Sequence, residues 1–416
     1  MRIPRRAASG LAASILVLSV GACSSSGSSS DTSSSSTGGT GASSSSASSS
    51  TINILVMADT TGPTKAYGSQ ELAGLMAAVN YYNNKGGIDG HKVVVTHISD
   101  NGDPATSASL LVNELSTNPG KFTMVYGGAE GTVIQALIPV IARYPVIAAA
   151  AGDDSLCSSV KTCPHQFSQV GPNALPQQTD ATWMQSKGYK KVGILEEQIA
   201  FTESETPAFK ADLTTAGISN SEATFTDSAV DLTAEMSQLK AAGAQAVFVL
   251  AVGPAAGYAL KARAALNWNV PILFDDAASS FDITTLVSKS LYANSFQTLR
   301  PVCVATLASP AYKDLVANLP AGTKITLPAN LVADGWDPIV MLDSAVTQAH
   351  STNDQALTSA LENLDAAGQS NPEYLLTPKL QFSATNHENI ADVPGNFAIV
   401  PVQPIVNGQV AVGSKS

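Results

Sequence analysis

The chemistry of Cys23 is set by its neighbours near the start of the chain. It follows two small residues and an apolar run over residues 11–20, which basic residues precede (Arg2, Arg5 and Arg6). A basic start, a short apolar run and small residues together indicate a secretory signal, and the run is too short to span a bilayer. Cleavage before Cys23 would leave both its thiol and a free amine at the new N-terminus.

This arrangement resembles a bacterial lipobox, in which the cysteine sulfur takes a diacylglycerol and the amine is then acylated. We therefore expect residues 1–23 to be a lipoprotein signal peptide that ends at the acylated Cys23. Two acyl chains hold a protein stably on a membrane. The expected location is extracytoplasmic, on the outer face of the bacterial cell membrane. The alternative is an ordinary signal peptide with a chance cysteine, and the chain is exported on either reading.

The other cysteines suit an oxidising exterior. Cys157 and Cys163 lie close together in a polar stretch, which favours a small disulfide loop. Cys303 lies in an apolar run and is expected to be a buried thiol. Zinc would need more ligands at short spacing than the nearby His165 supplies, so we expect no metal.

Sequence motifs of catalysis are absent. The chain has no G-x-S-x-G, H-E-x-x-H, P-loop or G-x-G-x-x-G pattern, and its five histidines are scattered.

The formal charge of −11 argues against nucleic acid as a partner. Residues 24–50 are almost entirely Ser, Thr, Gly and Ala, which predicts a disordered linker.

The residues after position 50 are predicted to alternate between strands and helices, and these elements must position any functional site. Apolar runs predict strands that are covered on both faces, and helical periodicity lies between them. The first series has expected strands at 52–58, 93–98, 122–126 and 146–151, with helices near 72–84, 104–115 and 132–143. The second has strands at 191–195, 246–252 and 271–274, with helices near 177–187, 207–215, 232–241 and 255–266. Two doubly wound α/β lobes would hold a ligand in the crevice at the carboxyl ends of their strands.

The stretch from INILVMADTTGPTKAYGSQ to HISDNGDPATS resembles the opening of the type I periplasmic substrate-binding proteins of branched-chain amino acid (Leu/Ile/Val) ABC transporters. VPILFDDA and DGWDPIVMLDSAV resemble later motifs of the same family. The resemblance implies two Rossmann-like lobes joined by a three-crossing hinge that closes on a ligand, for recognition by an ABC permease. It assigns residues 51–172 plus 300–370 to an N-terminal lobe and 173–299 plus 371–416 to a C-terminal lobe.

The resemblance also implies pocket residues. Tyr67 and Phe201 match aromatic positions that pack on a ligand, and Asp276 matches the acid that takes the ligand's ammonium group. The alternative for Asp276 is a solvated loop acid. Two hydroxyl-bearing positions that hold the ligand carboxylate in the family are Gly131 and Gly152 here, beside Thr132 and Ala151.

Acidic residues near these glycines put recognition of an α-carboxylate in doubt: either the glycine amides hold the carboxylate alone, or the ligand is not an α-amino acid. Glu130 would repel an anion, and it is either a solvated turn acid or a cleft residue that binds a hydroxyl or cationic group. Glu196 and Glu197 are either at the cleft rim or caps of the next helix. Trp336 either lines the hinge or belongs to the core.

The sequence thus predicts a non-enzymatic solute-binding lipoprotein without a cofactor. It would deliver a branched-chain amino acid, amide or related metabolite to an ABC importer. A ligand sensor on the same fold is the alternative, and a surface hydrolase using acids such as Glu130 and Asp276 is a further one.

Overall fold

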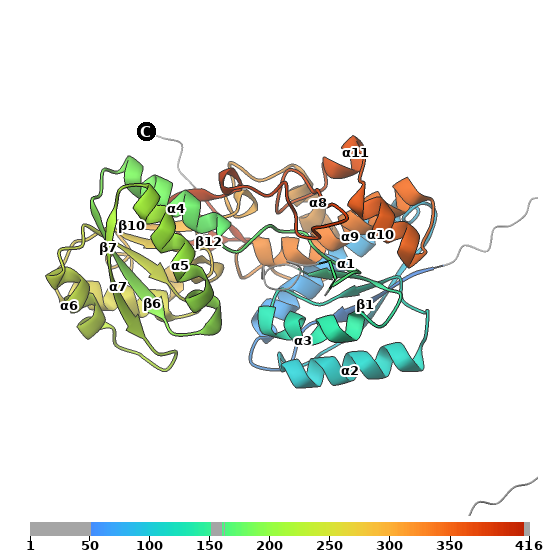
Figure 1. The fold of residues 1–416 in the computed structure, drawn as a ribbon, viewed down its shortest axis with the longest axis horizontal. Helices are drawn as coiled ribbons and strands as arrows, with labels where there is room; N and C mark the ends of the chain where they lie inside the picture. Colours follow the sequence, from blue (N-terminus) through green and yellow to red (C-terminus); the bar gives the residue numbers. More distant parts are fainter. Residues whose placement is uncertain (1–50, 151–159, 162, 412–416) are drawn as a thin grey trace, which may run out of the picture. The chain divides into compact units, whose positions relative to one another are not determined.

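The computed structural model describes residues 51–150, 160–161 and 163–411, and Figure 1 shows their fold. The first sheet is parallel, with the strand order β2-β1-β3-β4-β5. Its strands are β1 (Ile52–Met57), β2 (Val93–Ile98), β3 (Met124–Tyr126), β4 (Ile147–Ala150) and β5 (Gln166–Ser168). The helices between them are α1 (Lys65–Asn84), α2 (Pro104–Thr117) and α3 (Gly131–Ile141).

The second sheet has the order β11-β10-β9-β8-β6-β7 and is parallel except for β11, which is antiparallel to β10. Its strands are β6 (Lys191–Glu197), β7 (Ser219–Phe225), β8 (Ala246–Leu250), β9 (Ile272–Phe274), β10 (Ser295–Leu299) and β11 (Ala398–Pro401). The associated helices are α4 (Leu175–Ser186), α5 (Ala200–Thr215), α6 (Thr233–Ala241) and α7 (Ala255–Ala265). The expected pair of doubly wound α/β lobes is therefore confirmed.

Alternation along the strands explains why each sheet is covered on both faces. In β1, Ile54 and Val56 enter one buried cluster, and Leu55 and Met57 enter another on the opposite face. The strand β8 divides its side chains between two clusters in the same way. Successive side chains of a strand point to opposite faces, so a continuous apolar run is what a doubly covered strand requires.

Helices from the last third of the chain complete the first lobe. These are α8 (Ala311–Asn318), α9 (Asn330–Ala349), α10 (Asp354–Glu362) and α11 (Ala366–Gln369). The backbones of α1 and α9 approach closely at two glycines. A Cβ atom on Gly335 would lie 1.9 Å from the Glu71 carbonyl oxygen, and one on Gly74 would lie 1.8 Å from that of Val332.

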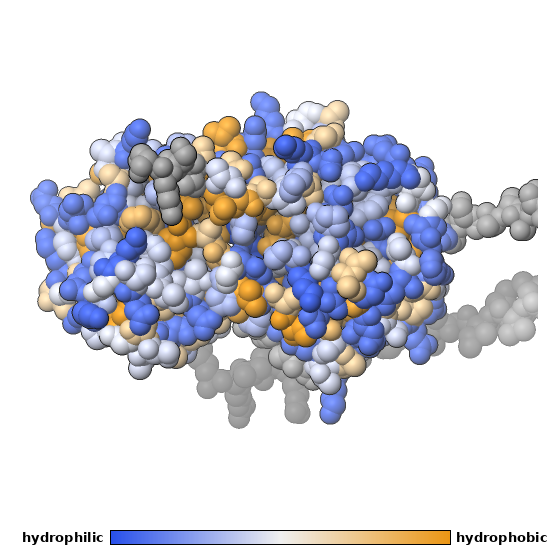
Figure 2. Space-filling model, turned by 90° about the horizontal axis from the view of Figure 1, so that it is seen from above, coloured by the Kyte–Doolittle hydropathy of each residue, from blue (hydrophilic) through white to orange (hydrophobic). Residues whose placement is uncertain are grey.

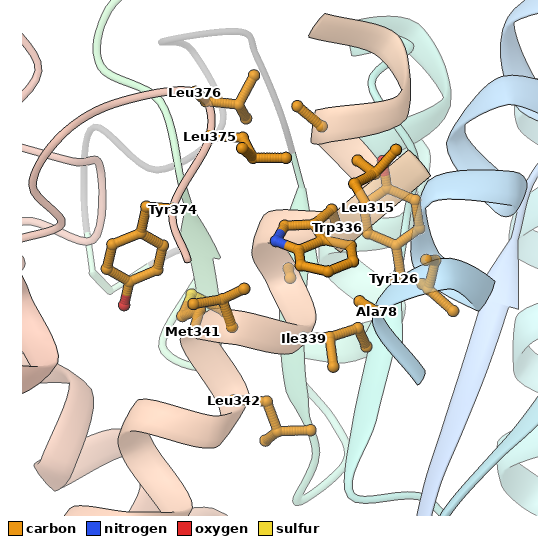
Figure 3. Close-up of a cluster of buried hydrophobic side chains, with 14 of the residues drawn as sticks. Ala78, Tyr126, Leu315, Trp336, Ile339, Met341, Leu342, Tyr374, Leu375 and Leu376 are labelled. Atoms are coloured by element: carbon orange, nitrogen blue, oxygen red, sulfur yellow. The ribbon is translucent and has the colours of Figure 1, made fainter. Parts of the chain in front are cut away.

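Trp336 lies in the core of the first lobe, as Figure 3 shows. Its side chain is fully buried, and its indole N–H donates to the Glu373 carbonyl oxygen at 2.8 Å. The core reading of this residue is therefore confirmed. Cys303 is likewise buried, as expected, and burial raises the pKa of its thiol to about 12.

The boundary expected at residue 371 is wrong. Tyr374, Leu375, Leu376, Leu380 and Phe382 all pack in the first core, beside Trp336 and Met341. The chain contributes β11 to the second sheet only after this segment. That boundary was implied by the resemblance, and apolar residues without helical or strand periodicity carry no signal of which core they join.

The chain passes between the lobes three times: after β5, after β10 and before β11. The Asp392 carboxylate, in the third crossing, joins all of them. It accepts from the Gly171 N–H at 3.0 Å in the first crossing and from Arg300 Nη2 at 2.9 Å in the second. Within its own crossing it accepts from the Asn396 side-chain amide at 2.9 Å.

The face seen in Figure 2 carries apolar residues mostly near its middle, and the flanks are largely polar.

Candidate functional site

A small hollow lies at the carboxyl ends of β1, β2 and β3. Its lining includes four acids: Asp59, Glu71, Asp100 and Glu130. None of the described residues that line it is basic. Parallel strands place the loops after their carboxyl ends at one edge of the sheet, which is where ligands of such folds bind.

Asp59 directly follows β1 and organises the turn into α1. It accepts from the backbone N–H groups of Thr61 at 2.9 Å and Gly62 at 2.6 Å through Oδ1, and from Thr64 at 2.9 Å through Oδ2. Burial would raise the pKa of Asp59, but the hydrogen bonds outweigh burial and hold the pKa below its usual value. Asp59 is therefore an ionised, fully bonded carboxylate.

Glu71 lies in the second turn of α1 and is 3 % exposed. The Tyr126 hydroxyl donates to its Oε2 at 3.3 Å. Burial, together with the charges of Asp334 and Glu130, raises the pKa of Glu71 to about 8. Glu71 is therefore mostly protonated at neutral pH.

Glu130 is the residue that precedes α3, and its side chain makes no capping bond to that helix. It is half-buried and lies near the Thr64 hydroxyl. Burial raises the pKa of Glu130, and the charges of Asp100 and Asp59 add to that effect. Glu130 therefore faces the hollow, on the side of the β1 and β2 loops.

Tyr67 connects the hollow of the first lobe with the second lobe. It lies in the first turn of α1, close enough to Glu130 for the two to interact electrostatically. Its hydroxyl lies near the side chain of Ser280, in the short helix η1 (Ala278–Ser280) that follows β9. The carboxyl-end loops of the two sheets thus meet at Tyr67.

Asp276 lies in the loop between β9 and η1. Its Oδ1 atom is buried and has no hydrogen-bond partner. Burial raises the pKa of Asp276 to about 6, although the nearby Arg300 guanidinium acts in the opposite direction. Arg300 itself is engaged with Asp392, so Asp276 has no direct ionic partner among the described residues.

The remaining predicted residues are dispersed along the chain. Gly131 is half-buried at the start of α3, and Thr132 is exposed. Phe201 is half-buried on α5. Ala151 and Gly152 lie outside the described residues. Cys157 does too, so its disulfide with the buried Cys163 stays a prediction.

Glu196 and Glu197, at the end of β6, are buried residues and bind to neighbouring elements. Glu197 Oε2 accepts from the Val252 N–H at 2.8 Å, which connects the carboxyl ends of β6 and β8. Glu196 Oε1 accepts from the Thr206 hydroxyl at 2.7 Å, in the middle of α5. Neither carboxylate is therefore a cap at the start of that helix.

Several residues of the site were missed at the level of sequence. Asp59, Glu71 and Ser280 carry none of the recognised motifs of catalysis or metal binding. Asp59 had one usable signal, because an acid directly after a predicted strand falls at the ligand-binding edge. The described residues contain no group of acids, histidines or cysteines that could hold a metal ion.

A family model described as periplasmic binding protein matches residues 51–399. The chain belongs to the periplasmic binding protein family. The family is one of extracytoplasmic transport binding proteins. In the described part of the chain, no helix has the length and apolar character that a membrane span needs.

Relatives and solved structures agree with this membership. Leu/Ile/Val-binding protein homolog 3 of Brucella melitensis is 24 % identical over 311 residues, which cover 73 % of this chain and 81 % of that protein. A periplasmic binding protein type 1 from Bordetella pertussis aligns with a TM-score of 0.67 at 19 % identity, covering 84 % of this chain and 96 % of that chain.

Two structures of the same fold contain ligands. A branched-chain amino acid transporter substrate binding protein of Streptococcus pneumoniae, solved with isoleucine, has a TM-score of 0.66 at 17 % identity and covers 82 % of this chain and 93 % of its own. An R. palustris solute binding protein, solved with 4-hydroxybenzoate, has a TM-score of 0.69 at 18 % identity. The alignment covers 87 % of this chain and 96 % of that chain. At these identities the likeness shows the fold of periplasmic binding proteins of type I.

Proposed function

We propose that this periplasmic binding protein is the lipid-anchored receptor of an ABC importer. It captures a branched-chain amino acid, an amide or a related metabolite between its lobes and delivers it unchanged to the permease. Lipid on Cys23 holds it on the outer face of the cell membrane. Residues 24–50 are a linker that leaves the folded part free to reach the permease.

The contact between Tyr67 and Ser280 is the observation that carries this proposal. It joins the loops at the carboxyl ends of both sheets, so a ligand held there touches both lobes. A ligand shifts an open–closed equilibrium only by its differential affinity for the two states. Contacts from both lobes supply that difference, because the second set forms only on closure.

The proposed pocket residues divide between the lobes. Tyr67, Glu130, Gly131 and Thr132 lie on the first lobe, where Ala151 and Gly152 follow β4 in the sequence. Phe201 and Asp276 lie on the second. Aromatic faces at Tyr67 and Phe201 suit an apolar part of the ligand, and carboxylates suit a donor group.

Uptake in cells tests the proposal. Deleting the gene should abolish import of the cognate solute at low external concentration, and the wild-type gene should restore it. In solution, small-angle scattering should show a smaller radius of gyration when that solute is added, and the solute should be recovered chemically unchanged. Normal uptake in the deletion strain, or a converted product, would contradict the proposed function.

A further inference from the structure

After β11 the chain returns to the first lobe, in addition to the three crossings of the hinge. Val402 still belongs to the second lobe: its side chain is buried in that core, and its N–H donates to the Ser295 carbonyl oxygen at 3.0 Å. Val410, further along, is fully buried in the core of the first lobe. Residues 403–410 connect the two lobes, and we call them the strap.

The strap ends in a two-stranded hairpin. Its strands are β12 (Ile405–Val406) and β13 (Gln409–Val410), and the turn between them consists of Asn407 and Gly408. Both turn residues have positive φ angles, 48° and 77°, as a tight two-residue turn of this kind requires. The hairpin is therefore a structure that its own sequence favours.

The first lobe holds this hairpin by hydrogen bonds and by close packing. The Gly408 carbonyl oxygen accepts from the Ala329 N–H at 2.8 Å, and the Asn407 carbonyl oxygen accepts from the Tyr312 hydroxyl at 2.6 Å. A Cβ atom on Gly408 would lie 2.7 Å from Ile325 Cγ2, so a larger residue would collide there. The hairpin is therefore firmly seated on the first lobe.

The second lobe holds the strap at Asp282, the residue that precedes the short helix η2 (Ile283–Thr285). Asp282 Oδ2 accepts from the Ile405 N–H at 3.2 Å. The same loop carries Ser280, which Tyr67 of the first lobe approaches. This loop of the second lobe is thus held by the first lobe twice, directly at Tyr67 and indirectly through the strap.

From these contacts we infer that the strap favours the closed arrangement, in which Tyr67 and Ser280 lie close together. Residues 402–407 can span at most about 17 Å, which limits how far apart their two anchors can lie. Opening that separates Ser280 from Tyr67 also draws Asp282 away from Ile405, because the hairpin keeps Ile405 on the first lobe. The bond between them adds to the free energy of opening.

This inference concerns the hinge, and it stands whether or not a bound solute is delivered to an importer. A strap of this kind lowers the free energy that a ligand must supply to close the lobes. Its effect is measurable without any ligand, as a change in the balance between open and closed molecules.

Asp282→Asn tests the second-lobe end of the strap. Asparagine keeps an oxygen for the Thr284 N–H, which Asp282 Oδ1 accepts at 3.0 Å, but it puts an amide NH₂ group where the acceptor of the Ile405 N–H was. Asp231→Asn is the matched control. Asp231 Oδ1 accepts from the Thr233 N–H at 2.9 Å in the same way, in the turn before α6.

Gly408→Ala tests the first-lobe end, because the added Cβ atom would overlap Ile325 and the Tyr312 hydroxyl and displace the hairpin. Gly243→Ala is its matched control. Gly243 has nearly the same φ, 80° against 77°, but nothing lies within 4 Å of a Cβ atom there. Both alanines therefore carry similar backbone strain, and only the one at position 408 meets a neighbour.

Hydrogen exchange and small-angle scattering of the whole chain without ligand measure the effect. We expect both test variants to exchange about fivefold faster than the wild type at residues 278–285, and to have a larger radius of gyration. Both controls should match the wild type. Unchanged exchange and an unchanged radius in the test variants would overturn the inference, and so would equal changes in the controls.

Exchange in β1 and β8, which lie in the two cores, separates loosening of the strap from unfolding. It should stay at the wild-type level in all four variants. If Gly408→Ala does not fold, Asp282→Asn decides the question by itself, because asparagine preserves the cap of η2. A wild-type profile of a folded Asp282→Asn would then show that the strap does not hold the lobes together.

Discussion

The Asp392 carboxylate shows how one residue can hold a hinge together. It receives donors from three separate crossings of the chain, and Arg300 supplies the opposite charge. The Asp392 side chain is fully buried and that of Arg300 is 13 % exposed. A buried pair of this kind adds modestly to stability when it is intact. Its loss is costly because the remaining charge stays buried without a partner.

We therefore expect Asp392→Ala to lower the free energy of unfolding by about 3–5 kcal/mol. Chemical denaturation monitored by circular dichroism measures this change. Lys210→Ala is a suitable control, because it removes one partner of the half-exposed Lys210–Glu222 pair. Such surface pairs contribute about 1 kcal/mol or less. An effect of Asp392→Ala no larger than that of Lys210→Ala would contradict the role of Asp392.

Glu71 makes the stability of the first lobe depend on pH. Its pKa rises on folding to about 8, so the folded state keeps a proton that the unfolded state has already released. Stability from this group is complete below the ordinary pKa of glutamate and is lost as pH rises toward about 8. Asp334 and Asp337, whose pKa values burial raises to about 7, act in the same direction.

We expect Glu71→Gln to reduce the fall in melting temperature between about pH 5 and pH 8.5, since glutamine has no proton to lose. The measurement is a thermal melt at several pH values. Glu203→Gln, an exposed change on α5, should leave the slope of that profile as in the wild type. A wild-type slope in Glu71→Gln would show that Glu71 does not keep its proton on folding.

At the scale of single residues, sequence reasoning reached the loops of the site but not its hydrogen bonds. It named Asp276 through the family resemblance and Glu130 through its place beside Gly131. It could not find Asp392 or Arg300, since their partnership joins residues 92 positions apart. Pairings of that kind depend on how the crossings run, which no local pattern encodes.

At the scale of elements, the pairing of α1 with α9 fixes the wall of the site. The Gly74 and Gly335 positions allow the two helix backbones to touch, and α1 carries both Tyr67 and Glu71. A side chain at either glycine would separate the helices and move those residues. Close contact of this kind is a reason for glycine inside a helix, where it otherwise lowers stability.

We expect Gly335→Ala to destabilise the fold by about 1–3 kcal/mol, because its Cβ atom would overlap the Glu71 carbonyl oxygen. It should also weaken ligand binding through displacement of α1. Thermal melts and calorimetry measure the two effects. Gly395→Ala is the matched control: nothing lies within 4 Å of a Cβ atom there. If Gly335→Ala is as stable as the wild type, the prediction is wrong, because the helices would then make room for the Cβ atom without loss of free energy of unfolding.

Most elements of both lobes could be predicted because their apolar runs and helical periods are clear. The prediction of a strand at 93–98 matches β2, and helix 104–115 matches most of α2. The strands β5, β7, β10 and β11 were missed. The sequence of β7, SNSEATF, is largely polar because β7 is an edge strand, and β5 has only three residues. Neither gives the continuous apolar run that marks an inner strand.

At the scale of the whole molecule, the proposed lipid anchor would attach the protein to the membrane through one residue, Cys23. We expect Cys23→Ser to release the protein from the membrane fraction into the medium or the soluble extracytoplasmic fraction, since the acyl chains supply the attachment. Fractionation with immunoblotting measures this, and mass spectrometry of the N-terminal peptide identifies the lipid. Cys303→Ser, a change at a buried thiol of the folded part, should leave the distribution unchanged. An unaltered membrane fraction of Cys23→Ser would contradict the lipid anchor.

Neither lobe is built from a continuous stretch of chain. The first core needs α8, α9 and residues 374–382, and the second sheet takes its edge strand β11 from residues 398–401. A nascent polypeptide therefore lacks part of both cores until nearly all of it has been synthesised. This dependence on the last segments therefore delays the folding of both lobes until synthesis is almost complete.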